Sequence, residues 1–224
     1  MNVTIQGEVH GSEEDKEAIL THGLESFDCL LIEGRKPEIE IQNLTIGYSI
    51  FIIGYVLGSW IQSTIETESG VDLQEEAENA DIEYNDQIDA DIPTMYQMVP
   101  ERLKQVIGLI LLLLIPVAII GVNRLVLVLY ISTIPLLYTG LVDNVGIRFA
   151  GGKRNQYMAN EIVRIADREN YDEAIVLCGQ SHLYGLTDEL ESRGHEVTSH
   201  DSNHWLRYPY LILKKVNDVI TAKL

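Results

Sequence analysis

The sequence feature that most limits the fold is an apolar run from Leu103 to Val142, LKQVIGLILLLLIPVAIIGVNRLVLVLYISTIPLLYTGLV. Its interior charge is Arg124, within a GVNR sequence near the middle of the run. A membrane-spanning helix needs about 20 apolar residues, and a helix of a soluble protein normally shows a polar face. The run therefore predicts a transmembrane hairpin of two helices, with a buried soluble hairpin as the alternative.

Basic residues flank the apolar run on both sides: Arg102, Lys104, Arg148, Lys153 and Arg154. Positive charges mark the cytoplasmic ends of membrane helices. We therefore expect a multi-pass protein of the cell membrane. Residues 1–102 and 143–224, on either side of the hairpin 103–142, would form one globular domain in the cytoplasm.

Outside this run, strand-like segments alternate with helix-like segments. The expected strands are NVTIQGEV, FDCLLIE, a short strand ending near Asp89, and DEAIVLC. The first helix would follow Ser12, a good N-cap with Asp15 completing a capping box. Further helices are expected over Leu73–Ala80, 151–170 and LYGLTDELESRG. This alternation predicts an α/β fold with a mainly parallel sheet, to which the tail 208–224 would add a strand and a helix.

Acidic residues outnumber basic residues 34 to 16, which gives a formal net charge of −18. The acids are spread from Glu8 to Asp218. This charge repels nucleic acid and is typical of proteins that stay soluble in a salt-accumulating cytoplasm, so we expect a halophilic source and no nucleic-acid partner. Cys29 and Cys178 lie in apolar segments, which indicates buried thiols rather than a disulfide or a metal site.

One structural corner occurs twice in the chain: an apolar strand ends in Gly-x-x-His, and a helix begins directly afterwards. The first corner runs from Gly7 to His10, and the second runs from Gly179 to His182. A glycine at such a corner permits a sharp turn and a close approach of the backbone to a ligand. Ligands of open α/β sheets bind beyond the carboxyl ends of the strands, so we predict that both histidines serve one site.

Two carboxylates, Glu33 and Asp89, also lie at predicted strand ends. Two imidazoles and one carboxylate make a three-ligand metal site with open positions. We therefore predict that His10, His182 and Glu33 bind a divalent metal ion (Mn, Co or Zn), which would generate hydroxide from water. We expect Glu33 and Asp89 to be catalytic. As alternatives, Glu33 would pair with a helix dipole or a cation, and Asp89 would cap a turn.

Arg154 lies one turn before Met158 and two turns before Ile162, so it shares the inward stripe of the predicted helix 151–170. An arginine on the core side of a helix needs an anionic partner or an anionic substrate. We predict that Arg154 stabilises a developing oxyanion, with Asn155 beside it in the catalytic site. The alternatives are an ion pair with one of the strand-end carboxylates for Arg154 and a first-turn polar position for Asn155.

A second apolar stretch, residues 44–61, has no charge and contains Gly54-x-x-x-Gly58, a spacing typical of packed membrane helices. If this stretch crossed the membrane in addition to the hairpin, His10 and His182 would lie on opposite sides of the bilayer. Because both histidines are expected in one site, we predict a buried or membrane-lying helix that does not span, with a single long pass over 103–142 as the alternative.

Together these motifs resemble TraB/PrgY-type proteins, the pheromone shutdown family, which is related to the TIKI metalloproteases and to the erythromycin esterase and ChaN-like group. The segments GEVHGS, LIEGR, GVDLQEEAENADIEYNDQIDADI, RNQYMANEI and VLCGQSHLYGL follow in the order seen in that family. The resemblance covers about residues 3–35, 70–95 and 145–195. It implies an α/β domain of two related halves whose Gly-x-x-His corners face each other across one cleft. Asn155 stands where the family usually has Asp, and the hairpin is the largest departure.

We therefore expect a membrane-anchored, divalent-metal-dependent hydrolase of peptidase type that acts on a peptide signal. This expectation follows from the resemblance, because TIKI proteins are metal-dependent peptidases and the prokaryotic branch controls peptide pheromones. One alternative is a non-catalytic membrane protein that binds or sequesters a peptide. Another is a small membrane component of a larger complex.

Overall fold

The computed structural model of the 224-residue chain describes residues 1–9, 12–35, 45–65, 70–121, 124–143 and 152–204. The chain divides into two compact units. The sheet unit comprises the described residues of 1–35, 68–89 and 155–224, and the helical unit comprises those of 36–67 and 90–154.

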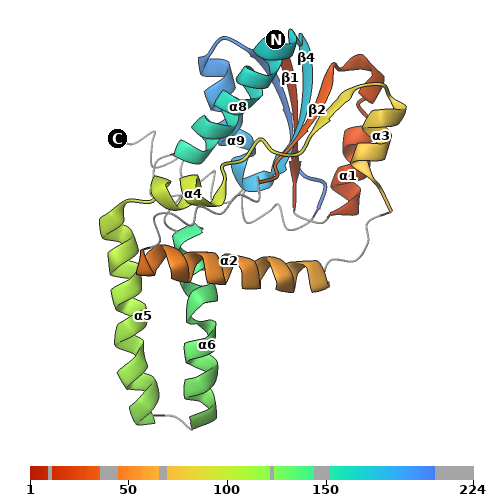
Figure 1. Ribbon diagram of the computed structural model, residues 1–224. Coiled ribbons are helices and arrows are strands. Elements are labelled where there is room, and N and C mark those ends of the chain that lie inside the picture. The colour runs from red at the N-terminus through yellow and green to blue at the C-terminus, as the bar shows by residue number, and fades with distance from the viewer. Residues whose placement is uncertain (10–11, 36–44, 66–69, 122–123, 144–151, 205–224) are drawn as a thin grey trace, which may run out of the picture. The chain divides into compact units, whose positions relative to one another are not determined.

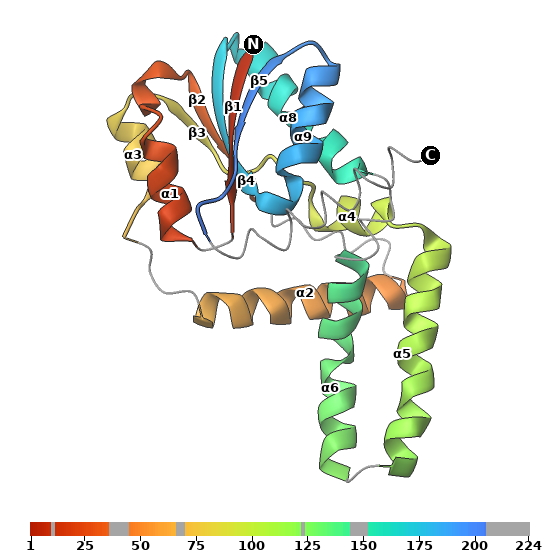
Figure 2. The same cartoon turned by 180° about the vertical axis from the view of Figure 1, so that it is seen from behind.

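The sheet unit contains a five-stranded parallel sheet with the strand order β3-β2-β4-β1-β5 (Figures 1 and 2). The strands are β1 (Asn2–Glu8), β2 (Cys29–Ile32), β3 (Glu83–Asn85), β4 (Glu173–Gly179) and β5 (Glu196–His200). The predicted α/β fold with a mainly parallel sheet is therefore confirmed.

The two strands that lead into the Gly-x-x-His corners, β1 and β4, are neighbours in this sheet. In their parallel register Gly7 lies opposite Cys178, and Glu8 lies opposite Gly179. Both strands therefore end at the same edge of the sheet, although they lie far apart in the sequence. His10 lies outside the described residues.

Helices cover both faces of the sheet. One face carries α8 (Lys153–Glu169) and α9 (Gln180–Ser192), and the other carries α1 (Glu13–Leu20) and α3 (Leu73–Asn79) (Figures 1 and 2). Side chains alternate along each strand, so Val176 belongs to the core under α8 and α9, whereas Ile175 and Leu177 belong to the core under α1 and α3. This two-sided burial explains why the central strands are apolar throughout.

The N-cap of α1 follows the sequence prediction, but the predicted capping box is not completed, because the Ser12 backbone N–H donates to the Val9 carbonyl oxygen at 2.9 Å and not to Asp15. Ser12 is the N-cap, and the Asp15 backbone N–H donates to Ser12 Oγ at 3.3 Å. The Asp15 carboxylate accepts the Val9 backbone N–H at 2.9 Å, which holds the end of the β1 corner against the helix. The chain leaves α1 through Gly23, whose φ of +74° favours glycine.

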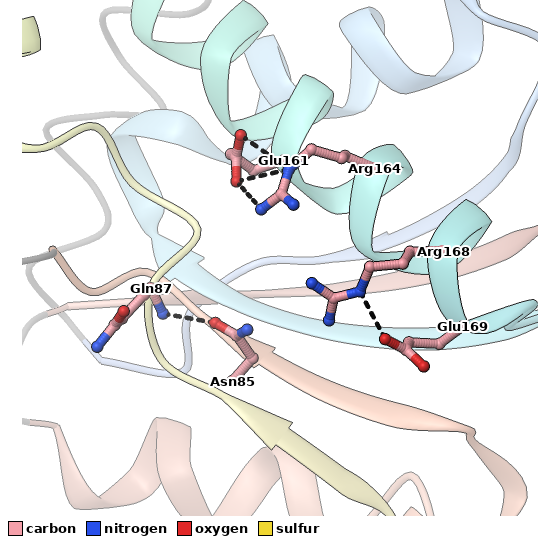
Figure 3. A network of polar contacts seen from close by, with 6 residues as sticks. All are labelled: Asn85, Gln87, Glu161, Arg164, Arg168 and Glu169. Atoms are coloured by element: carbon pink, nitrogen blue, oxygen red, sulfur yellow. Dashed lines mark hydrogen bonds and ion pairs between the residues drawn. The ribbon is translucent and has the colours of Figure 1, made fainter.

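The apolar stripe predicted for α8 is also confirmed, because its members are buried in the core: Met158, Ile162 and Ile165. The outer side of α8 carries ion pairs instead, Glu161 with Arg164 and Arg168 with Glu169 (Figure 3). One helix therefore separates its apolar and charged side chains, as a helix that covers a sheet in water should.

Cys29 in β2 and Cys178 in β4 are buried thiols that form no disulfide, as predicted. Burial raises the pKa of Cys29 to about 12, and the nearby carboxylates of Asp28 and Glu83 add to this shift. The Cys29 thiol is therefore protonated at neutral pH and packs as a small apolar side chain.

Two details of the predicted sheet differ from the structure. The edge strand β5 was not predicted, because EVTSH is mostly polar. The short strand that was expected to end near Asp89 ends at Asn85, and Asp89 forms an isolated parallel bridge with Arg35. The strand and helix predicted for the tail 208–224 lie outside the described residues.

The helical unit contains α2 (Ile46–Ile65), α4 (Ile92–Met98), α5 (Glu101–Gly121) and α6 (Arg124–Leu141). α5 and α6 run side by side in both views (Figures 1 and 2), and the break between them coincides with GVNR, so the prediction of two helices over 103–142 is confirmed. The sequence also predicted that this hairpin is transmembrane, and here the structure differs. Among the described residues, no helix is long and apolar enough to cross a membrane.

The predicted helix at 44–61 is present as α2, which packs against α6 through a glycine. A Cβ atom at Gly54 would lie 2.0 Å from the carbonyl oxygen of Pro135 and 2.3 Å from Thr139 Oγ1. The Thr139 hydroxyl donates to the Phe51 carbonyl oxygen at 2.9 Å. Only glycine allows the two helices to approach this closely.

Candidate functional site

Glu33 follows β2 at the carboxyl edge of the sheet. Its backbone N–H donates to the Leu177 carbonyl oxygen at 2.9 Å, which continues the pairing of β2 with β4. Its Oε2 accepts the Gly179 backbone N–H at 2.6 Å, and its side chain is only 5% exposed. Gly179 is the N-cap of α9, so the positive end of the helix dipole stabilises the carboxylate.

His182 lies in the first turn of α9 and faces Glu33. Its Nε2 is 3.8 Å from Glu33 Oε1, and its Nδ1 is 2.7 Å from Asn155 Oδ1. The amide oxygen of Asn155 only accepts hydrogen bonds, so Nδ1 is the donor of this pair. In the neutral imidazole the lone pair is therefore on Nε2, the atom that faces Glu33.

Asn155 reaches His182 because α8 and α9 approach closely at Gly185. A Cβ atom at Gly185 would lie 2.0 Å from Asn155 Nδ2. The Asn155 amide therefore occupies the space that a larger side chain at position 185 would need. Gly185 was not among the predicted site residues, although a glycine inside the helical segment LYGLTDELESRG is a usable signal for a close helix contact.

The structure thus brings three predicted site residues together: Asn155, His182 and Glu33, with the turn glycine Gly179 beside them. Asn155 orients the imidazole, His182 presents Nε2, and Glu33 presents Oε1. An imidazole and a carboxylate that are fixed in this way can share a cation or transfer a proton.

Asp89 is held by an arginine. Arg35 Nε donates to Asp89 Oδ2 at 2.8 Å, and the Asp89 side chain is 0% exposed. The Asp89 backbone N–H donates to the Gly34 carbonyl oxygen at 3.1 Å. Breaking a buried pair of this kind costs about 3–5 kcal/mol, so Asp89 fixes the segment that follows β2, whatever its part in catalysis.

The structure does not test the predicted roles of two further site residues, Arg154 and His10. Arg154 lies in the first turn of α8 and is half-buried. His10 lies outside the described residues. The oxyanion role of Arg154 and the metal-binding role of His10 stay predictions.

The predicted metal ligands can be tested by their geometry. A zinc ion lies about 2.0–2.2 Å from imidazole nitrogen and carboxylate oxygen ligands. His182 Nε2 and Glu33 Oε1, 3.8 Å apart, can therefore contact one ion. Among the residues with described positions, no group of three or more His, Cys, Asp or Glu side chains is placed to hold a metal. Of the three predicted metal ligands, the structure describes two, His182 and Glu33, and these two can contact the same ion.

A buried polar network next to the β1 corner was not predicted. Gln180 is 2% exposed; its Oε1 accepts the Ser202 backbone N–H at 2.7 Å, and its Nε2 donates to Asp201 Oδ1 at 2.8 Å. A Cβ atom at Gly7 would lie 2.5 Å from Gln180 Oε1. Because both ends of Gln180 are held, Gly7 is needed for the packing of β1 against α9.

Asp15 anchors the same loop from the other face of the sheet. Its buried carboxylate accepts the Val9 backbone N–H at 2.9 Å, the Ser202 hydroxyl at 2.6 Å and the Asn203 backbone N–H at 2.6 Å. One carboxylate therefore ties the segment that leads to His10 to the loop that follows β5. The capping box revealed Asp15 in the sequence, but no pattern could reveal a partner 187 residues away.

A pocket of about 370 Å³ lies at the carboxyl ends of β1 and β2, on the α1–α3 side of the sheet. Ile32, which directly precedes Glu33, contributes to its wall. Polar side chains of both charges also line it: Glu8, Lys16 and Asp72.

Comparisons of this chain with protein-family models, curated proteins and solved structures found no match.

Proposed function

We propose that this protein is a membrane-associated, divalent-metal-dependent hydrolase that cleaves a peptide or amide bond. The observation that supports this best is the contact chain from Asn155 through His182 to Glu33 at the carboxyl edge of a parallel sheet. This edge is where open α/β sheets bind their ligands.

In this proposal His182 and Glu33 would supply two metal ligands, and His10, from the first Gly-x-x-His sequence, would supply the third. A divalent ion bound there would supply an activated water at neutral pH. Asn155 holds the imidazole in the tautomer whose Nε2 is free of a proton. Arg154 would stabilise negative charge on the substrate oxygen, and Asp89 would assist catalysis from its pair with Arg35.

The proposed substrate class rests on the pocket beside Ile32. The presence of Lys16 together with Glu8 and Asp72 in its wall suits a ligand that carries groups of both charges, as a short peptide does. The family resemblance points to the same substrate class.

We further propose that the helical unit contacts a lipid bilayer, with the sheet unit on the cytoplasmic side. Large apolar side chains of this unit are exposed, including Trp60 at 66%, Leu112 at 61% and Leu113 at 61%. A surface of this kind is costly in water and favourable against lipid. The basic residues that flank 103–142 favour the cytoplasmic side for the sheet unit.

The test of the proposed hydrolase compares metal content and peptide cleavage in His182→Ala, Glu33→Gln and Asn155→Ala with the wild type. We expect about one divalent ion per wild-type chain, little metal in the first two variants, and metal affinity lowered by about 10–100-fold in Asn155→Ala, because a partner that orients a ligand has an effect of this size. His195→Ala is the matched control, because its backbone N–H closes the end of α9 and its imidazole has no part in the contact chain.

Metal binding that is unchanged in His182→Ala and Glu33→Gln would reject the metal site. Peptide binding without cleavage, in a protein loaded with metal, would support the non-catalytic peptide-binding alternative.

A further inference from the structure

The helical unit contains a cavity that the proposed hydrolase site does not use. Its volume is about 550 Å³, and α2, α4, α5 and α6 all contribute to its wall. Most of the wall is apolar: Ile46, Ile50, Leu109, Leu111, Leu112 and Ile134. Cavities of about 300–1,000 Å³ with an apolar wall and a few polar groups are the usual binding sites of small organic ligands.

The main polar group of this cavity is the ammonium of Lys104. The Lys104 side chain is 7% exposed; its Nζ donates to the Tyr96 carbonyl oxygen at 3.2 Å and lies 3.9 Å from the centre of the Tyr96 ring. Its carboxylate partner, Glu101, is 2.8 Å away, but the Glu101 side chain is 66% exposed. The cation of the pair is therefore buried in the wall of the cavity, whereas the anion is in solvent.

This asymmetry allows the anionic partner of Lys104 to be exchanged. A buried ammonium needs a carboxylate nearby, but Glu101 keeps its hydration when it swings away. A carboxylate that enters the cavity would replace Glu101 without leaving Lys104 unpaired. Two hydroxyls in the same wall, those of Tyr96 and Tyr138, form a hydrogen bond at 3.4 Å in which either can be the donor. The hydroxyl that accepts this bond keeps its own proton, which it can donate to a second carboxylate oxygen.

From these features we infer that the cavity binds the carboxylate of a free fatty acid at Lys104, with its hydrocarbon chain along the apolar wall. Leu109 and Leu112 are 56% and 61% exposed, so part of the wall opens to the surroundings and gives the chain an entry. The inference is independent of the proposed hydrolase, because it concerns other residues and needs no metal.

The experiment measures displacement of parinarate, a fluorescent fatty acid, from the full-length protein by palmitate and by hexadecan-1-ol. The alcohol has the same chain length and a neutral head. We expect palmitate to bind at least about tenfold more tightly than hexadecan-1-ol, because only palmitate makes a charge-assisted contact with the ammonium. Lys104→Met should remove this difference, and Glu101→Gln should increase palmitate affinity because it removes the competing carboxylate.

Two glycine variants locate the site. Gly108 lines the cavity, and a Cβ atom there would meet its nearest neighbour, Tyr138, only at 3.8 Å, so Gly108→Phe would project a ring into the cavity. Gly140 in α6 does not line the cavity, and a Cβ there would meet nothing within 4 Å, so Gly140→Phe is the matched control. We expect Gly108→Phe to abolish parinarate binding and Gly140→Phe to preserve it.

The inference is overturned if palmitate and hexadecan-1-ol bind equally to the wild type, if Lys104→Met leaves their difference intact, or if the two phenylalanine variants behave alike. Circular dichroism of each variant separates a loss of binding from a loss of fold. A fully helical Gly108→Phe that still binds parinarate counts against the site.

Discussion

The two units of this chain treat apolar side chains in opposite ways. In the sheet unit, strands and helices bury their apolar residues in two cores on the two faces of the sheet. Among the described residues, every large apolar side chain with high exposure belongs to the helical unit, on α2, α5 or α6. α8 turns its apolar stripe to the core and charged pairs outward, whereas α5 buries Ile107 and Leu111 but also exposes leucines.

This is a difference in the surfaces that the two units expose. The sheet unit has the surface of a domain that folds in water, where the apolar residues are inside and the charges outside. The helical unit also buries apolar side chains, such as Phe51 and Met95, and adds a close glycine contact and a backbone-directed hydroxyl between α2 and α6. Stability in the sheet unit should therefore depend mainly on buried volume, and stability in the helical unit should depend in addition on the close backbone approach at Gly54.

The largest expected effect comes from a matched pair of truncations. Ile162 in α8 is 0% exposed, so Ile162→Ala should lower the free energy of unfolding by about 2–5 kcal/mol. Leu112 in α5 is 61% exposed, so Leu112→Ala should change it by less than about 0.5 kcal/mol in water. Urea unfolding of both variants checks this. A large loss in Leu112→Ala would mean that the face of α5 is covered in solution, and the comparison of the two units would fail.

An intermediate effect is expected from two glycines of the helical unit. Gly54→Ala would push a methyl group into the Pro135 carbonyl oxygen, so it should destabilise the unit by about 1–3 kcal/mol. Gly140→Ala meets open space and should be neutral or add up to about 1 kcal/mol, because alanine favours helix. Thermal unfolding followed by circular dichroism measures both. Equal melting temperatures would show that α2 and α6 do not depend on this contact.

Much of the fold could be predicted from local patterns, and the exceptions have physical reasons. The central strands are apolar because both faces are covered, so they were visible in the sequence. β5 was missed because it is an edge strand whose side chains are mostly polar and partly exposed, with Val197 as its apolar contact to the core. The apolar run 103–142 predicted two helices correctly, but their placement across a membrane is not what the described residues show.

The part of the candidate site that lies at the ends of strands could be predicted from the sequence. Glu33 and His182 follow β2 and β4, which pair directly. The rule that ligands bind beyond the carboxyl ends of parallel strands therefore predicted correctly that they lie close together. The hydrogen bond from His182 to Asn155 depends on how closely α8 and α9 approach, which is set by Gly185 and not by any spacing in the sequence. The pairing of Arg35 with Asp89 depends in the same way on the path of the chain after β2.

A smaller effect is expected from the net charge of the whole chain. Self-repulsion from a net charge of −18 weakens the folded state at low ionic strength. At about 1 M salt the Debye length falls to about 3 Å, so the Tm should rise steadily from low to molar KCl. KCl is preferred to sulfate, which strengthens apolar burial by exclusion from the surface. A Tm that is flat or falls across this range would remove the halophile interpretation.

The smallest effect is expected from a histidine pair in the sheet unit. Burial holds the pKa of His22 below its ordinary value of 6.5, and His200, whose ring centre is 4.5 Å away, lowers it further. The unfolded chain therefore takes up a proton at His22 more readily than the folded chain, and stability falls as the pH drops below about 6.5. His22→Gln should flatten the decline in Tm between about pH 7 and pH 5, whereas His200→Gln should retain most of it, because burial is the larger cause. If the decline is the same in His22→Gln as in the wild type, the acid sensitivity arises elsewhere in the molecule.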